Sequence, residues 1–192
     1  MDADFSIELG RDDPVLDFPW TDPDGRLAYH DLKNHPELLA QVEEANQFPE
    51  LGEFLRSVNS THSRFESAKC DVWSTQEIAP EEEVFGATYK HASYVDLVLS
   101  SNDRRQSFAW HERFAKRLVE LLQRTPETPS AAELLIRRCH FQQDAAIQEG
   151  YYATLYVSGY GWNEQQARQN WGIALKLAGN AILQLSAAGL FY

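Results

Sequence analysis

The stretch that decides the fold covers residues 151–185 and reads YYATLYVSGYGWNEQQARQNWGIALKLAGNAILQL. Its first ten residues alternate, with Ala153 and Leu155 on one side, as in a strand that buries one face. Asn163 and, three residues later, Gln166 are typical of a capped helix start. The apolar residues that follow recur at helical spacing and predict a single buried stripe: Ala167, Trp171, Ala174, Leu175, Ala178, Ile182 and Leu185.

The same order of elements occurs twice in the chain. Alternating patterns predict two strands at about residues 65–78 and 88–99, and Ser101 begins the cap of a long helix. They predict two more strands at about residues 132–141 and 151–160, which lead into the closing helix, with a stop at Gly189. The sequence therefore indicates two strand–strand–helix units.

Residues 1–60 are expected to form an irregular acidic arm followed by two short helices. Turn-forming and helix-breaking residues lie close together in residues 12–14 and 22–25. Pro36 and Pro49 suit the first positions of the two helices. The arm is too apolar for a free tail, so we expect it to lie along the domain or along a partner.

Together these elements predict an α+β fold, in which two units form a four-stranded antiparallel sheet with two long helices on one face. We expect a single domain over residues 1–192, with the arm and short helices in 1–60, the first unit in 61–126 and the second in 127–192. The order of elements resembles that of dimeric secretion chaperones. This resemblance in fold order implies a dimeric interaction protein.

The charge of the chain excludes several classes of partner. Seventeen basic and 29 acidic residues give a formal net charge of -12. Nucleic acids and anionic membranes attract basic proteins, so we expect neither as a partner.

The first 30 residues lack the apolar run of a signal peptide, and Cys70 and Cys139 fit no disulfide framework. We therefore expect a cytoplasmic protein.

One face of the predicted sheet is rich in tyrosine. If Val95, Leu97 and Leu155 point toward the helices, the side chains between them point the other way. We predict a candidate binding face on that side, and we call it the tyrosine face. Its predicted members are Trp73, Tyr94, Asp96, Arg138, His140, Tyr152, Tyr156 and Tyr160.

Three interpretations of the tyrosine face are open at this stage. The N-terminal arm and helices could cover it, with the hydroxyl groups reaching water at the rim. A second copy of the chain or another protein could bind it, because tyrosine combines a large contact area with a polar tip. A small ligand could also bind there.

The sequence contains no recognisable catalytic, metal-binding or cofactor-binding motif. The six histidines are scattered, so we predict no metal site and no cofactor. Cys139 and His140 are adjacent, and adjacent residues in a strand point to opposite faces. Residues 157–161 lack the first glycine of a nucleophile elbow. The carboxylates of residues 81–83 read as a solvated loop, and we predict no catalytic residues.

The function that these observations favour is a non-enzymatic protein-interaction module: an acidic adaptor, chaperone-like or inhibitor-type domain. We expect it to form a homodimer or to bind a protein partner. The alternative is a small-molecule-binding domain, with or without catalysis, whose site lies on the tyrosine face.

Overall fold

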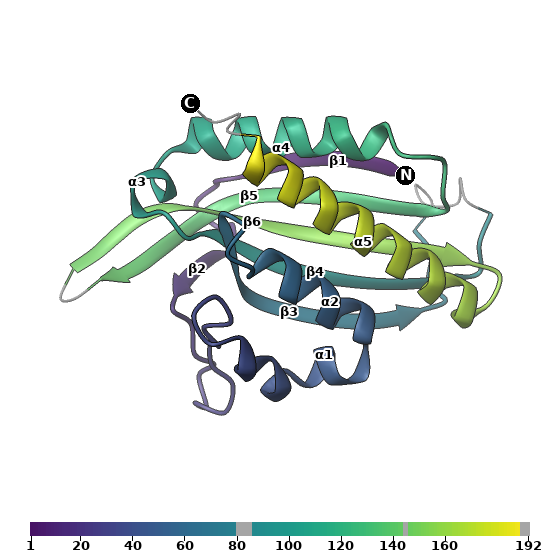
Figure 1. Cartoon of the computed structure of the whole chain (residues 1–192), viewed down its shortest axis with the longest axis horizontal. Coiled ribbons are helices and arrows are strands. Elements are labelled where there is room, and N and C mark those ends of the chain that lie inside the picture. The colour runs from purple at the N-terminus through teal and green to yellow at the C-terminus, as the bar shows by residue number, and fades with distance from the viewer. Residues whose placement is uncertain (80–85, 144–145, 189–192) are drawn as a thin grey trace.

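The computed structural model describes residues 1–79, 86–143 and 146–188 of the chain. In these residues a six-stranded sheet carries its longer helices on one face (Figure 1). The strands are β1 (Asp2–Glu8), β2 (Val15–Phe18), β3 (Phe65–Thr75), β4 (Tyr89–Leu99), β5 (Ser130–Gln143) and β6 (Ala146–Gly161). The helices are the 3-10 helix η1 (Pro36–Gln41), then α1 (Glu43–Gln47), α2 (Pro49–Val58), α3 (Asn102–Arg105), α4 (Phe108–Gln123) and α5 (Glu164–Ala187). The predicted acidic loop at residues 81–83 and the stop at Gly189 lie outside the described residues.

The α+β fold and both strand–strand–helix units are confirmed. The first unit is β3, β4 and α4, and the second is β5, β6 and α5. Within each unit the two strands are antiparallel, and β4 pairs with β6 in the middle of the sheet. The start of α5 is also as predicted, because the Asn163 side chain accepts a hydrogen bond from the backbone N–H of Gln166.

The prediction of a four-stranded antiparallel sheet was wrong, because the arm contributes two further strands. Both β1 and β2 run parallel to β5, which makes the sheet mixed. Ala3, which is buried, alternates with Asp2 and Asp4, which are exposed. The N-terminal ammonium group donates to the carbonyl of Pro126, over 3.2 Å. The arm is therefore an ordered edge of the sheet.

Two predicted boundaries also differ from the structure. The first long helix begins later than expected, at α4, where the Ser107 side chain accepts from the backbone N–H of Trp110. The polar segment expected as a turn between residues 142 and 150 is mostly strand, because β5 extends to Gln143 and β6 restarts at Ala146. The end of this β5–β6 ribbon projects from the sheet (Figure 1). Gln142 and residues 146–149, near its end, are exposed.

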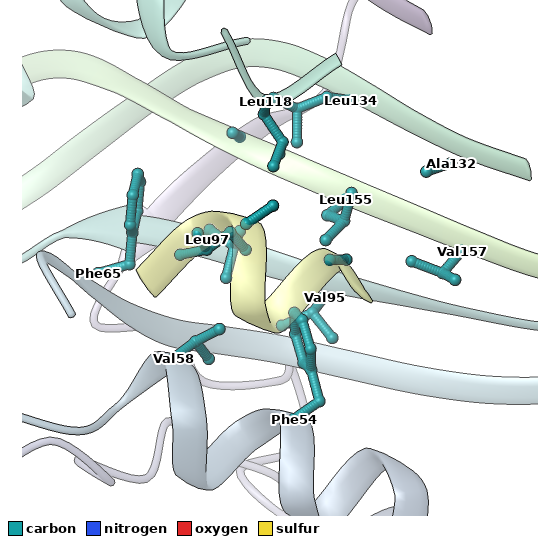
Figure 2. Packing of buried hydrophobic residues seen from close by; sticks show 14 of the residues in the cluster. Phe54, Val58, Phe65, Val95, Leu97, Leu118, Ala132, Leu134, Leu155 and Val157 are labelled. Carbon is teal, nitrogen blue, oxygen red and sulfur yellow. The ribbon is translucent and has the colours of Figure 1, made fainter. Parts of the chain in front are cut away.

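The main core lies between the sheet and the helices α2, α4 and α5 (Figure 2). Strand residues such as Leu97 and Leu155 point toward it, as their alternation predicted. The helices supply Phe54, Leu118 and the fully buried Trp171. No helix within residues 1–79, 86–143 and 146–188 has the length and apolarity to span a membrane.

A second, smaller apolar cluster lies on the opposite face of the sheet, at the end where the arm crosses it. Its buried members are Leu16, Phe18, Ala68, Val98, Cys139, Phe141 and Tyr152. The indole of Trp20 donates to the carbonyl of Ala68, over 2.6 Å, and so holds the arm there. Ala68 lies on this face although Cys70 packs against the main core, because an irregularity between Ser67 and Cys70 reverses the alternation.

The backbone of the closing helix, α5, lies in direct contact with the backbone of β6. A Cβ atom added to Gly159 would overlap the backbone of Ala167 and Trp171, and one added to Gly161 would lie 2.6 Å from the backbone nitrogen of Ala167. The absence of side chains at these two glycines therefore permits the close approach of strand and helix.

Gly159→Ala should therefore be strongly destabilising, by at least about 3 kcal/mol, because neither backbone can move away without opening the main core. Urea denaturation would measure the change. Gly172→Ala is the matched control, since its added Cβ would meet only the flexible side chain of Glu50, at 3.0 Å. That variant should remain within about 1 kcal/mol of wild type. Equal losses in the two variants would contradict this account.

Candidate functional site

The strand register places five side chains of the tyrosine face next to one another, one from each of five strands. In order across the sheet they are Asp71 of β3, Tyr94 of β4, Tyr156 of β6, Glu133 of β5 and Asp4 of β1. We call this set the acidic tyrosine row. The two tyrosine rings are half-buried, with centroids 5.8 Å apart, and the three carboxylates are exposed. Aromatic rings in the middle and carboxylates at both ends therefore reach solvent together.

A polar network lies beside this row. The Asp96 carboxylate is only 5% exposed and accepts a hydrogen bond from the Thr154 hydroxyl, over 2.6 Å. The Thr154 oxygen in turn accepts from the Arg137 guanidinium, over 3.2 Å. Arg137 also donates to the Glu8 carboxylate, over 2.7 Å. One chain of contacts thus links β4, β6, β5 and β1 across the sheet.

The network has unusual proton affinities. Burial raises the pKa of the Asp96 carboxyl to about 6, against the hydrogen bond from Thr154 and the positive charges of Lys69 and Arg137. Burial also raises the pKa of Tyr94, and the nearby charges of Asp96 and Asp71 add to this effect. For Arg137 burial acts in the opposite direction, but the hydrogen bond to Glu8 and further polar neighbours raise its pKa. The negative charges of Asp96 and Asp71 thus help to keep the Tyr94 hydroxyl protonated by raising its pKa.

Six of the eight predicted site residues lie on the tyrosine face. Tyr94, Asp96 and Tyr156 come together at its centre, and Trp73, 36% exposed, lies at the β3 edge. Tyr160 lies toward one end and is buried, and Tyr152 is buried in the second apolar cluster.

Arg138 and His140 lie on the opposite face, with the helices. Arg138 pairs with Tyr151, whose ring lies 5.5 Å from that of Phe108 in α4. Arg138 donates to the carbonyl of Gly10, and His140 pairs with Asp17. Both line a cavity of about 230 Å³ that is separate from the tyrosine face.

The sequence reasoning missed Arg137, Glu133 and Asp4. The apolar run of Leu134, Leu135 and Ile136 conceals which parity of β5 faces the helices. The strand register shows which β5 residues share a face with the tyrosines, because Arg137 pairs with Tyr152 and Glu133 pairs with Tyr156. For Asp4, the alternation of acidic and apolar residues in β1 was the available signal.

Cavities of a size suited to small ligands lie elsewhere. The largest of the four that stand out among the described residues measures about 500 Å³ and lies between the arm, α1 and β3, near Trp20 and Lys69. The others measure about 330, 230 and 220 Å³. None of the four is lined by Tyr94 or Tyr156.

Within the described part of the chain, no group of three or more histidine, cysteine or acidic side chains is placed to hold a metal ion. No protein-family model, curated protein or solved structure matches the chain significantly.

Asp96 should make the stability of the protein depend on pH. Because its pKa in the folded state, about 6, lies above the usual value of 3.8, the folded state binds more protons between these values. The contribution of Asp96 to the free energy of unfolding must therefore fall as pH rises through this window. Two pKa units correspond to about 3 kcal/mol at most. Urea denaturation of wild type and Asp96→Asn between pH 4 and 7 should show the variant gaining stability relative to wild type as pH rises.

Thr154→Val provides a second variant for the same measurement. The Thr154 hydroxyl lowers the pKa of Asp96, so its removal should move the transition to higher pH and enlarge the fall in stability. A constant difference between wild type and Asp96→Asn over this range would contradict the assignment.

Proposed function

We propose that the protein is a non-enzymatic protein-interaction module that binds its partner on the tyrosine face. The observation that supports this most directly is the acidic tyrosine row, in which two half-buried tyrosine rings lie between exposed carboxylates. Tyrosine contributes a large contact area at a small cost in side-chain entropy and is enriched in protein interfaces. An adaptor, chaperone-like or inhibitor-type domain needs such a recognition face and no reaction chemistry.

The size and rigidity of the face suit this role. Neighbouring strands lie about 4.8 Å apart, so the five-strand row spans about 19 Å. The row rests on the sheet, and the Asp96–Thr154–Arg137 network holds neighbouring side chains in place. A site on a rigid sheet loses little conformational entropy on binding. The arm packs on the end of the face formed by the second apolar cluster, and no arm residue is among the printed ring contacts of Tyr94 and Tyr156.

The charge of the row favours a different protein over a second copy of this chain. In a symmetric dimer the same patch meets itself, so Asp4, Asp71 and Glu133 would face the same carboxylates of the partner. Like charges across an interface cost several kcal/mol. We therefore assign the tyrosine face to a partner of different sequence.

The alternative function, small-molecule binding on the tyrosine face, has less support. Ligand sites usually enclose most of their ligand in a concave pocket, and the four cavities noted above are lined by other residues. A small ligand would be better accommodated near Trp20 and Lys69, in the cavity of about 500 Å³.

Selection from a random peptide library on the immobilised protein tests the proposal. Peptides selected on wild type should lose at least about tenfold in affinity for the double variant Tyr94→Ser/Tyr156→Ser, because aromatic anchors dominate binding at interfaces. The matched control is Tyr89→Ser, which removes a half-buried tyrosine from β4 but on the helix side. Affinities would be measured by fluorescence anisotropy.

The double variant should still fold, with a midpoint of thermal unfolding within about 5 °C of wild type, because both rings are partly exposed. If no selected peptide distinguishes the double variant from wild type, the tyrosine face is not the binding site.

A further inference from the structure

The acidic tyrosine row carries negative charge that the protein does not neutralise. In the part of the chain that the structure describes, Asp4, Asp71 and Glu133 take part in no ion pair. The cations that the structure describes on or beside this face are already engaged, including Lys90, which lies over the Tyr160 ring, 5.8 Å from its centroid. Lys69 lies over the Trp20 ring, 4.5 Å from its centroid, and Arg137 pairs with Glu8. A cation from a binding partner would therefore neutralise the carboxylates of the row.

The tyrosine pair adds a second preference for cations. The faces of aromatic rings attract ammonium and guanidinium groups, and arginine makes such contacts most often. Tyr94 and Tyr156 present two such rings side by side at a tilt of 45°. Asp71 and Glu133 flank them on either side in the register. A guanidinium group over the rings would be attracted by both the rings and the flanking carboxylates.

The spacing of the row limits the shape of the partner. With strands about 4.8 Å apart, Asp71 and Glu133 are about 14.4 Å apart, and the midpoint of the tyrosine pair lies about 7.2 Å from each. In an extended chain, side chains on one side recur every two residues, or about 6.7 Å. On a helix, residues four apart rise by about 6 Å. Two such steps differ from the spacing between Asp71 and Glu133 by about 1 Å in an extended chain and by about 2.4 Å on a helix.

We propose, resting on the interaction role above, that the partner segment is an extended chain with basic residues at alternate positions. One basic side chain lies over Tyr94 and Tyr156, and its neighbours two residues away on either side pair with Asp71 and Glu133. Asp4 extends the row toward the next basic residue. Arginine fits the central position best, because its planar group stacks on aromatic faces.

The test uses two synthetic seven-residue peptides of the same composition, with blocked ends and a fluorescent label. One has arginine at its second, fourth and sixth positions and serine elsewhere, and the other has its three arginines in a row. Wild type should bind the alternating peptide at least about fivefold more tightly in anisotropy titrations at about 50 mM salt. Equal affinities would show that only charge is recognised and would overturn the inference.

A pair of triple variants with matched charge separates the row from the net charge of the protein. Asp4→Asn/Asp71→Asn/Glu133→Gln should lower affinity for the alternating peptide at least about tenfold. The amides keep the oxygen atoms that accept from the backbone N–H groups of Phe5 and Val72. Asp24→Asn/Glu53→Gln/Glu127→Gln, which removes exposed carboxylates elsewhere, should lower it less than about twofold. Equal losses would overturn the inference.

The library selection distinguishes this inference from the proposed function. If the selected peptides depend on Tyr94 and Tyr156 but carry no alternating basic residues, the interaction role stands and the basic partner is wrong. If neither synthetic peptide binds and no selected peptide depends on the two tyrosines, both are wrong.

Discussion

The arrangement of the whole molecule depends on the backbone contact between α5 and β6. Gly159 and Gly161 remove the side chains that would separate the closing helix from the central strand. The helix therefore lies deep against one face, where it meets Phe54 and Leu118 in the main core (Figure 2). Because all the apolar helix stripes are committed to this side, the other side is free to carry polar and aromatic groups.

On that other side, the buried polar groups specify the register of the sheet more than they stabilise it. Removing Asp96 from water is costly, and the hydrogen bond from Thr154 offsets only part of this cost. A slip of one residue between β4 and β6 would turn Asp96 toward the main core, at a far greater cost. The network thus excludes wrong pairings and fixes the positions of Tyr94 and Tyr156 next to it.

Much of the fold could be predicted from the sequence, because β4 and β6 alternate cleanly and the helices of the two repeated units bear single apolar stripes. The arm strands were missed since acidic residues and breakers dominate residues 2–18, although Ala3 alternates with Asp2 and Asp4. On β5, three consecutive apolar residues hide which alternate side chains face the helices. The prediction therefore put Arg138 on the tyrosine face in place of Arg137. The irregularity beside Ala68 depends on pairing between strands, and a single strand's sequence does not reveal it.

The parallel arm also has a consequence for folding during synthesis. β1 is made before its partner β5, which begins at Ser130, and the N-terminal ammonium group binds the carbonyl of Pro126. The chain must be made as far as β5 before the arm can dock, and such distant contacts form slowly. Until then the alternating carboxylates of β1 disfavour its pairing with the edge of another sheet, because charged side chains oppose edge-to-edge pairing.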